Sequence, residues 1–392
     1  MINALVADRV LTKAFVAKEP KAFLPIPVTA SIWNLIRKRA LYVTLCLTDK
    51  CNMACNLCFM CDNQGRSYVQ EFRREDILLV VKNIGTKKKV LLSGGEPTLR
   101  EDLLDIIDII KKSDNIPVLY TNGIRLADFD YVKSLADHGL EKIYLSLDGL
   151  NENTTSVICG DRSYLAFKLK ALDNLKKVGS IKVWLTPRIA YGVNEHEIGS
   201  LLDLAVCDDS RTIKGIMFIA ATRNGLSKYH LPADTATTAD YLLEHIEINT
   251  GGVLNTRYFR EFNRLRENLN CYLGKFHASM PLSYNRVLAR IKNGRIEQFI
   301  PLDDLKEINY LIENRKITSL AKYAYKYRAW LSLVKYVYAP TLMEFDVKER
   351  DDIIFIGVTY ITDEPLPTLE KRGLMNLVKG VSSFHLYAQG PT

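Results

Sequence analysis

The stretch LYVTLCLTDKCNMACNLCFMC, from Leu41 to Cys61, joins an apolar run to four closely spaced cysteines. The run LYVTLCL (41–47) has the length and composition of a buried β-strand. The cysteines that follow it have the spacing C-x3-C-x2-C-x2-C. Thiols gathered this closely usually bind a metal. The sequence therefore predicts a metal-binding loop at the end of a strand, and the number of ligands decides its chemistry.

The composition is that of a soluble globular protein with a sizeable core. The chain has 392 residues, of which 47% are hydrophobic and 25% charged. Charges interrupt residues 1–27, so no secretory signal is predicted, and no apolar run approaches the ~20 residues of a membrane span. We therefore expect a cytoplasmic protein with reduced thiols, in which a cysteine cluster indicates a metal and not disulfides.

The net charge of +8 is unevenly placed, with basic stretches at 37–39 and 322–335. Such charge suits phosphates, nucleic acid or anionic lipid, but it also suits ordinary solvated helix faces. Charge alone therefore does not choose a partner.

Apolar runs alternate with amphipathic stretches between residues 41 and 225. The pattern predicts six strands, at 41–47, 90–93, 117–121, 142–147, 181–190 and 215–220. It also predicts five helices, one after each of the first five strands, at 74–84, 101–112, 128–139, 162–179 and 194–206. Repeated βα units imply a parallel sheet with right-handed crossovers. Six units are too few for a closed eightfold barrel, so an open or partial barrel is expected, with ligands at the carboxyl ends of the strands.

Three segments follow from this pattern: an N-terminal extension (1–40), the βα core (41–225) and a C-terminal substrate-side extension or small domain (226–392). The last segment is predicted to contain a helix at 257–269, an amphipathic helix at 317–338 and a strand at 351–361. It carries no motif that identifies a substrate.

The four cysteines alone leave three kinds of metal site open. A structural zinc site needs four ligands, usually in two knuckles separated by a loop, and no second knuckle is present here. A bacterial ferredoxin has C-x2-C-x2-C-x3-C followed by proline, whereas this stretch has the three-residue gap first. The third kind is a cluster held by three thiolates.

The stretch SGGEP (93–97), at the end of the second strand, helps to decide between these three kinds of metal site. Its two glycines allow close approach of a ligand to the backbone, and Glu96 adds a carboxylate. Together with C-x3-C-x2-C after the first strand and the six βα units, GGEP resembles the radical S-adenosylmethionine (radical SAM) superfamily over residues 41 to 225. The resemblance implies an α/β fold, a partial (β/α)6 barrel of the radical SAM type with an N-terminal extension and a C-terminal α+β extension.

The resemblance also implies the cofactors. Cys51, Cys55 and Cys58 would hold three irons of a [4Fe–4S] cluster, and S-adenosylmethionine would chelate the fourth. One electron would then cleave S-adenosylmethionine to a 5′-deoxyadenosyl radical that abstracts hydrogen from a substrate. Cys61 is left out of this ligand set, and no catalytic side chain is identified beyond the cluster. An electron donor such as ferredoxin or flavodoxin is expected as a partner.

Further cofactor contacts are implied position by position. The GGEP backbone and Glu96 would meet the amino group of the methionine, polar residues after strands three and four would lie near the ribose or carboxylate, and Asn194 would line the adenine while capping a helix. Arg188 would pair with the carboxylate, or be a surface or supporting arginine. The full set of expected cofactor-binding residues is Gly94, Gly95, Glu96, Pro97, Thr121, Asn122, Ser146, Asp148, Arg188 and Asn194.

The remaining cysteines are scattered. Cys46 falls within the first strand, where a free cysteine is usually a small core residue. Cys159, Cys207 and Cys271 lie far apart in the sequence, so no auxiliary cluster is expected.

Residues 165–225 are also similar to a subgroup that contains archaeal tetraether lipid synthases and proteins described as pterin methylases. This similarity suggests a lipid substrate and radical C–C bond formation, and the Tyr- and Lys-rich 317–338 stretch would suit an interfacial helix in peripheral contact with a membrane. An ordinary packed helix with its lysines outward is the favoured explanation of that stretch. The chain lacks the further cysteines of that subgroup, which leaves two alternatives: a maturase of a peptide or small-metabolite cofactor, and a non-catalytic metal-binding interaction protein. No nucleic acid partner is expected.

Overall fold

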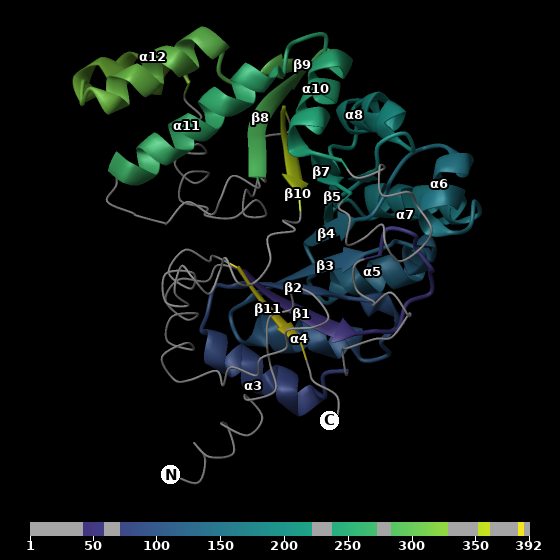
Figure 1. Ribbon diagram of the computed structural model, residues 1–392. Helices are drawn as coiled ribbons and strands as arrows, with labels where there is room; N and C mark the ends of the chain where they lie inside the picture. Colours follow the sequence, from purple (N-terminus) through teal and green to yellow (C-terminus); the bar gives the residue numbers. More distant parts are fainter. Residues whose placement is uncertain are drawn as a thin grey trace, which may run out of the picture.

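The computed structural model describes residues 42–58, 71–221, 237–272, 284–327, 352–360 and 383–387. Its centre is one large sheet (Figure 1) with the strand order β11-β1-β2-β3-β4-β5-β7-β10-β8-β9, in which β6 pairs with β7 alone. The strands are β1 (Tyr42–Thr48), β2 (Lys89–Gly94), β3 (Ile116–Thr121), β4 (Lys142–Leu145), β5 (Lys182–Leu185), β6 (Arg188–Ile189), β7 (Ile213–Ala220), β8 (Tyr284–Lys292), β9 (Arg295–Gln298), β10 (Ile353–Tyr360) and β11 (Ser383–Tyr387).

The predicted partial barrel is confirmed. Strands β1 to β5 and β7 are parallel neighbours in chain order. The fifth predicted strand, 181–190, is divided into β5 and β6 around Pro187, because proline has no N–H to give to a ladder. The Pro187 carbonyl still accepts from the backbone N–H of Ile219 at 2.8 Å, so the divided strand stays attached to β7.

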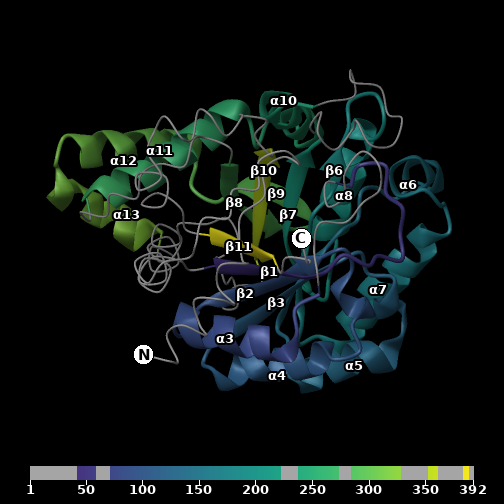
Figure 2. The same cartoon turned by 60° about the horizontal axis from the view of Figure 1, so that its bottom comes forward.

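Helices cover the outer face of the sheet. Figure 2 shows α3, α4, α5 and α7 in sequence along that face. They bury their apolar stripes: in α4, Ile106, Ile107 and Ile110 are buried while Lys111 is exposed. The helices of this region are α3 (Arg74–Ile84), α4 (Leu103–Lys112), α5 (Phe129–Asp137), α6 (Glu152–Cys159), α7 (Tyr164–Val178) and α8 (Ile198–Val206), with 3-10 turns η1 (Pro97–Leu99), η2 (Arg125–Ala127) and η3 (Glu195–Glu197).

Helix α6 was not predicted from the sequence. Its sequence ENTTSVIC has little helical periodicity and several β-branched residues, which favour strands over helices. The helix is defined by its ends instead. The Asn151 side chain accepts from the backbone N–H of Asn153, and Gly160 ends the helix in the left-handed conformation at φ 92°. The helix lies between β4 and α7.

Strands from the last third of the chain extend both edges of the sheet. Strand β10, predicted at 351–361, pairs in parallel with β7, and β11 pairs in parallel with β1. Within the described residues, β11, β1, β2, β3, β4, β5, β7 and β10 thus form a run of parallel neighbours that is longer than the predicted six. The β8–β9 hairpin continues the sheet in antiparallel fashion. The described strands of the last third of the chain thus belong to the same sheet as the core.

The helices of the C-terminal region are α10 (Ala239–Asn249), α11 (Thr256–Tyr272), α12 (Leu302–Glu313) and α13 (Ala321–Lys326), with the 3-10 turn η5 (Ile317–Leu320). Of the predicted 317–338 helix, η5 and α13 are described, and residues 328–338 lie outside the described ranges. Lys322 pairs with Glu307 at 2.8 Å and Lys326 with Asp304 at 2.6 Å. Both lysines thus pair with acidic side chains of α12, as expected of an ordinary packed helix.

Across the described residues, no helix combines the length and the apolar character needed to span a bilayer.

Buried Asn174 of α7 provides a test of how the helices are held. Its Nδ2 donates to the carbonyls of Leu126 at 3.0 Å and Ala127 at 2.9 Å in η2. Asn174→Ala should lower the free energy of unfolding by about 1–3 kcal/mol, because both bonds are lost from a buried position. Denaturant unfolding followed by circular dichroism measures this. Lys170→Ala, at an exposed position of the same helix, is the matched control. Equal effects of the two variants would contradict the prediction.

Candidate cofactor site

The two glycines of GGEP bring the end of β2 against the start of the cysteine loop. The backbone N–H of Gly95 donates to the Thr48 carbonyl at 2.7 Å, and that of Glu96 donates to the Lys50 carbonyl at 2.8 Å. A Cβ atom on Gly94 would lie 2.3 Å from the Thr48 oxygen, and one on Gly95 would lie 2.3 Å from the Lys50 oxygen. Glycine is therefore required at both positions for the two segments to approach.

Glu96 is fully buried and joins the ends of β2 and β3. Its Oε1 accepts from Thr98 N at 3.1 Å, Thr98 Oγ1 at 2.6 Å and Thr121 Oγ1 at 2.7 Å, while Oε2 accepts from Asn122 N at 2.7 Å. Burial raises the pKa of this carboxyl, although the four donors favour its charged form. Pro97 is buried as the first residue of η1. Both oxygens of Glu96 thus already have partners, and its predicted contact with the methionine amino group stays a prediction.

Asn122 connects the end of β3 to the first cysteine. Its Nδ2 donates to Asn52 Oδ1 at 2.7 Å and lies 3.9 Å from Cys51 Sγ. Its Oδ1 accepts from the backbone N–H of Ile124 at 3.0 Å, which fixes the orientation of the amide. Thr121 and Asn122, both expected near the cofactor, are therefore placed beside the cysteine loop.

The three predicted ligand cysteines share one loop. Cys51 is exposed, Cys55 and Cys58 are partly buried, and the Cys58 N–H closes a turn onto the Cys55 carbonyl at 3.2 Å. The Cys51 residue is exposed overall, but its sulfur is partly desolvated, and this raises the pKa of the Cys51 thiol. The charges of Glu96, Cys55 and Cys58 raise it further. Among the described residues, no three Cys, His, Asp or Glu side chains are arranged as a ready metal site. The ligand set thus stays a prediction from the sequence, and Cys61 lies outside the described residues.

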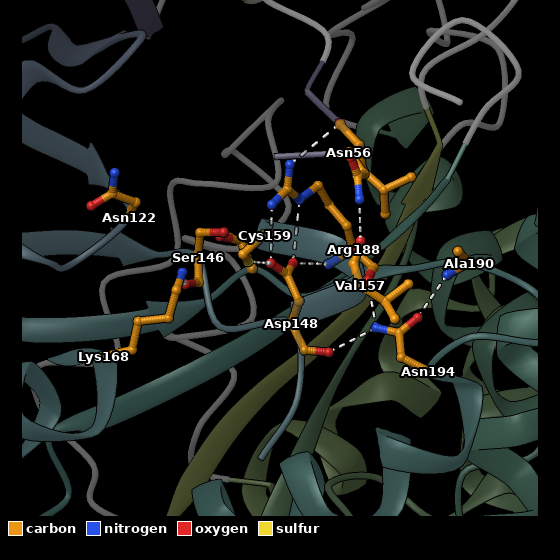
Figure 3. Close-up of polar contacts among 12 residues, drawn as sticks. Asn56, Asn122, Ser146, Asp148, Val157, Cys159, Lys168, Arg188, Ala190 and Asn194 are labelled. Carbon is orange, nitrogen blue, oxygen red and sulfur yellow. Dashed lines mark hydrogen bonds and ion pairs between the residues drawn. The ribbon is translucent and has the colours of Figure 1, made fainter. Parts of the chain in front are cut away.

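An ion pair between buried Asp148 and half-buried Arg188 joins the segment after β4 to β6 beside this loop (Figure 3). Arg188 donates to Asp148 from its backbone N at 2.8 Å, from Nε at 3.2 Å and from Nη2 at 3.0 Å. Its Nη1 also donates to the Leu57 carbonyl at 3.3 Å. Burial alone would raise the pKa of Asp148, but Arg188 and Lys168 outweigh it and the pKa is lowered. Arg188 is thus a half-buried, paired arginine that supports the cysteine loop.

Asn194 supports the same pair from below. Its Nδ2 donates to the carbonyls of Asp148 at 2.7 Å and Arg188 at 2.8 Å, and its Oδ1 accepts from Ala190 N at 2.8 Å (Figure 3). It occupies the residue before η3 but makes no side-chain capping bond, so the predicted cap is wrong. The physical reason is that its amide is fully used between β4 and β6. Its proposed role in lining the adenine remains untested.

Two buried side chains of the site were missed from the sequence. Lys168 of α7 is 1% exposed, and its Nζ donates to the Ser146 carbonyl at 2.5 Å (Figure 3). Cys159, also 1% exposed, lies with its Sγ 3.5 Å from Asp148 Oδ2. A signal for Lys168 did exist, because it falls on the apolar stripe of α7 between Leu165 and Leu172. For Cys159 the sequence holds no such signal, since helix α6 was not predicted.

The end of α6 holds the cysteine loop. Asn56 donates from its backbone N to the Ile158 carbonyl at 2.7 Å, and from Nδ2 to the Val157 carbonyl at 2.5 Å. A Cβ atom on Gly160 would lie 3.2 Å from the Ala54 carbonyl oxygen, so this turn also lies close to the loop. The loop is therefore fixed from β2 on one side and from α6 on the other.

The sequence comparisons agree with this geometry. The sequence model of the Radical SAM superfamily matches residues 45–205, from β1 to α8. Residues 45–205 therefore form a radical SAM domain, the domain of an enzyme class that uses a [4Fe–4S] cluster and S-adenosylmethionine.

The curated relatives include enzymes that act on pterins and on GTP. The chain is 32% identical over 219 residues to 7,8-dihydro-6-hydroxymethylpterin dimethyltransferase of Methanocaldococcus jannaschii, covering 54% of this chain and 42% of that protein. It is 36% identical over 173 residues to GTP 3′,8-cyclase of Clostridium perfringens, covering 42% of this chain and 51% of that protein. The chain thus spans about half the length of these relatives. The first match confirms the expected similarity to the pterin branch of the subgroup.

Solved structures also resemble the chain. Streptococcus suis SuiB bound to S-adenosylmethionine is 20% identical with a TM-score of 0.45, covering 55% of this chain and 48% of that one. SuiB bound to precursor peptide SuiA is 17% identical with a TM-score of 0.46, covering 64% and 57%.

Glu96→Gln tests the role of the buried carboxylate. Whichever way the new amide is turned, its NH2 group meets a backbone N–H, either of Thr98 or of Asn122, so at least one buried donor loses its acceptor. The free energy of unfolding should fall by about 1–3 kcal/mol. Chemical denaturation of the metal-free chain measures this without any cofactor. Glu101→Gln, at an exposed position five residues along, is the control. An unchanged stability in Glu96→Gln would show that the carboxylate is dispensable to the fold.

Proposed function

We propose that this chain is a radical SAM enzyme that binds a [4Fe–4S] cluster through Cys51, Cys55 and Cys58. The observation that carries the proposal is the cysteine loop itself, which is attached to GGEP on one side and to the Asp148–Arg188 pair on the other. Both attachments lie at the carboxyl ends of the parallel strands, where ligands of such sheets bind. Thiolates are also the ligands that iron–sulfur clusters require.

The [4Fe–4S] cluster, when bound, would supply one-electron cleavage of S-adenosylmethionine, which yields a 5′-deoxyadenosyl radical for hydrogen abstraction. The protein's part is to position the reactants and to exclude competing reactions. A reductant such as ferredoxin or flavodoxin is proposed as the electron donor.

The cationic side chains beside the cysteine loop suit an anionic ligand. Lys168 is a buried cation and Arg188 a half-buried one, and both lie beside the buried carboxylate of Asp148. Buried charge is costly unless it is compensated. Thiolate ligands and the carboxylate of a methionyl group would both supply negative charge here. Lys168 donates from Nζ to the Ser146 carbonyl, at the end of the fourth strand, where the resemblance implies contacts near the ribose or the carboxylate. We therefore assign Lys168 and Ser146, with Gly94 and Gly95, to S-adenosylmethionine binding.

The second substrate is proposed to be a small heterocyclic metabolite. The names of the two relatives above state that one acts on a pterin and the other on GTP. A lipid substrate with C–C bond formation was the first expectation from the sequence. Lys322 and Lys326, two of the lysines that suggested an interfacial helix, are paired with acidic residues of α12, which removes one reason for it. A peptide substrate remains the alternative within the maturase class.

Anaerobic reconstitution tests the enzyme class. The reconstituted chain should hold about four irons and four sulfides, as one cubane cluster requires. With dithionite it should release 5′-deoxyadenosine from S-adenosylmethionine, measured by liquid chromatography. One tightly bound zinc without cleavage would instead identify a metal-binding interaction protein.

Single cysteine variants serve as the matched controls. Cys51→Ala, Cys55→Ala and Cys58→Ala should each lose the cluster absorbance, while Cys61→Ala should keep it. Loss of the cluster in Cys61→Ala would mean that the site uses four thiolates and leaves no iron open.

A deuterium-transfer assay tests the substrate class. The reconstituted enzyme is given a deuterated reduced pterin, deuterated GTP or a deuterated isoprenoid lipid, each with S-adenosylmethionine and dithionite. Deuterium should appear in 5′-deoxyadenosine with the pterin or with GTP, because hydrogen abstraction moves a substrate hydrogen to that product. Mass spectrometry detects the label. Transfer from the lipid alone would contradict the small-metabolite proposal.

A further inference from the structure

Three aromatic side chains form a row across the middle of the sheet. The strand register places Tyr120 of β3 opposite Tyr144 of β4, and Tyr144 opposite Trp184 of β5. Residues that lie opposite each other in neighbouring strands point to the same face of a sheet. The ring centroids are 6.2 Å apart in both pairs, and the planes of Tyr120 and Tyr144 differ by 28°. The three rings thus form one continuous aromatic surface.

This aromatic row faces the inside of the partial barrel. A Cβ atom on Gly123 would lie 2.6 Å from Leu145 Cδ1 and 3.7 Å from Ala171 Cβ of α7, so Leu145 points toward that helix. Tyr144 precedes Leu145 in β4 and points the opposite way, because successive side chains of a strand alternate between the two faces. Helix α7 lies on the outer face of the sheet with α3, α4 and α5 (Figure 2). The row therefore lies on the inner face.

The two buried rings of the row are held in place. Tyr144 and Trp184 are each 2% exposed. The Nζ atom of Lys142 lies 3.7 Å from the centroid of the Trp184 ring, and a Cβ atom on Gly215 would lie 2.6 Å from Trp184 Cδ1. Tyr120, in contrast, is half-buried. Of the three rings, that of Tyr120 is the one with surface left for a ligand, and the rings beside it are fixed.

Tyr120 also lies close to the candidate cofactor site. Asn122, two residues further along the chain, has its Nδ2 3.9 Å from Cys51 Sγ. A strand rises about 3.3 Å per residue, so Tyr120 is about 7 Å from Asn122 along the chain direction. A molecule that rests on the Tyr120 ring would thus lie beside the residues assigned to the cluster and to S-adenosylmethionine. A substrate has to be held there for the radical to reach its hydrogen.

We infer that Tyr120 contacts the second substrate and that its ring selects a planar heterocycle by stacking. This inference rests on the proposed function and makes its substrate site more specific. Aromatic rings gain from offset-stacked contacts with one another beyond the area that they bury, so a flat ring system gains more on Tyr120 than a saturated chain does. Tyr120 lies outside the set of cofactor-binding residues, so its effect on the substrate is separable from the effect on S-adenosylmethionine.

Equilibrium dialysis tests this role. Each reconstituted chain is dialysed against 7,8-dihydro-6-hydroxymethylpterin, against GTP and, separately, against S-adenosylmethionine. Tyr120→Leu and Tyr120→Met both remove the ring, so that one variant serves if the other fails to fold, and Tyr120→Phe removes the hydroxyl alone. Tyr310→Leu, at a residue of α12 that is 51% exposed, is the control. Iron content and release of 5′-deoxyadenosine are measured on the same samples.

Tyr120→Leu and Tyr120→Met should bind the heterocycle that the wild type binds about tenfold more weakly, as expected for the loss of one aromatic stack. Tyr120→Phe and Tyr310→Leu should bind it like the wild type, and the affinity for S-adenosylmethionine should be unchanged in every variant. Equal affinity for the heterocycle in the wild type and in both ringless variants would overturn the inference and leave the proposed function intact. A parallel loss of affinity for S-adenosylmethionine would also overturn it, because Tyr120 would then be a structural residue.

The wild-type chain separates this inference from the proposed function. Cluster uptake and cleavage of S-adenosylmethionine without binding of either heterocycle would overturn the inference and the small-metabolite proposal, while the enzyme class would stand. A wild-type chain that takes up no cluster and releases no 5′-deoxyadenosine would overturn the proposed function and, with it, the inference.

Discussion

The ion pair between buried Asp148 and half-buried Arg188 is the contact on which the site depends. It connects the end of β4 with β6, while Arg188 reaches the cysteine loop and Asn194 holds both partners from beneath. Breaking a buried pair by removing one partner typically costs about 3–5 kcal/mol, because the other charge is left uncompensated. One interaction thus sets the separation of two strand ends and the position of the loop between them.

The same pair shapes the electrostatics of the loop. Arg188 and Lys168 raise the local positive potential beside Cys55, and both contribute to lowering its pKa after the hydrogen bond from Cys159. On the other side of the loop, desolvation raises the pKa of Cys51, and the charge of Glu96 adds to this. The thiols of one short loop therefore differ in how readily they ionise.

The sequence predicts the parts of this site that depend on local patterns, and it does not predict those that depend on contacts between residues far apart in the chain. The six strands and the C-x3-C-x2-C and GGEP motifs are local patterns, and the βα order alone brings their strand ends to one edge. Helix α6 was missed because ENTTSVIC has no strong period, and the contacts of Asn56 and Cys159 were missed with it. The capping role expected of Asn194 failed because its amide serves residues six and forty-six positions away. Hydrogen bonds between residues this far apart in the chain produce no recognisable spacing of residue types in the sequence.

The pairing of β11 with β1 has a consequence for how the chain reaches its fold. Tyr42 lies opposite Ser383, so the edge of β1 is covered by a strand synthesised near the other end of the described chain. Until then β1 presents unpaired backbone groups, which are a template for association with other chains. Contacts between such distant segments also slow folding. During synthesis the strand that leads into the cysteine loop therefore keeps an open edge until β11 has been made, and this edge is exposed to association with other chains in the meantime.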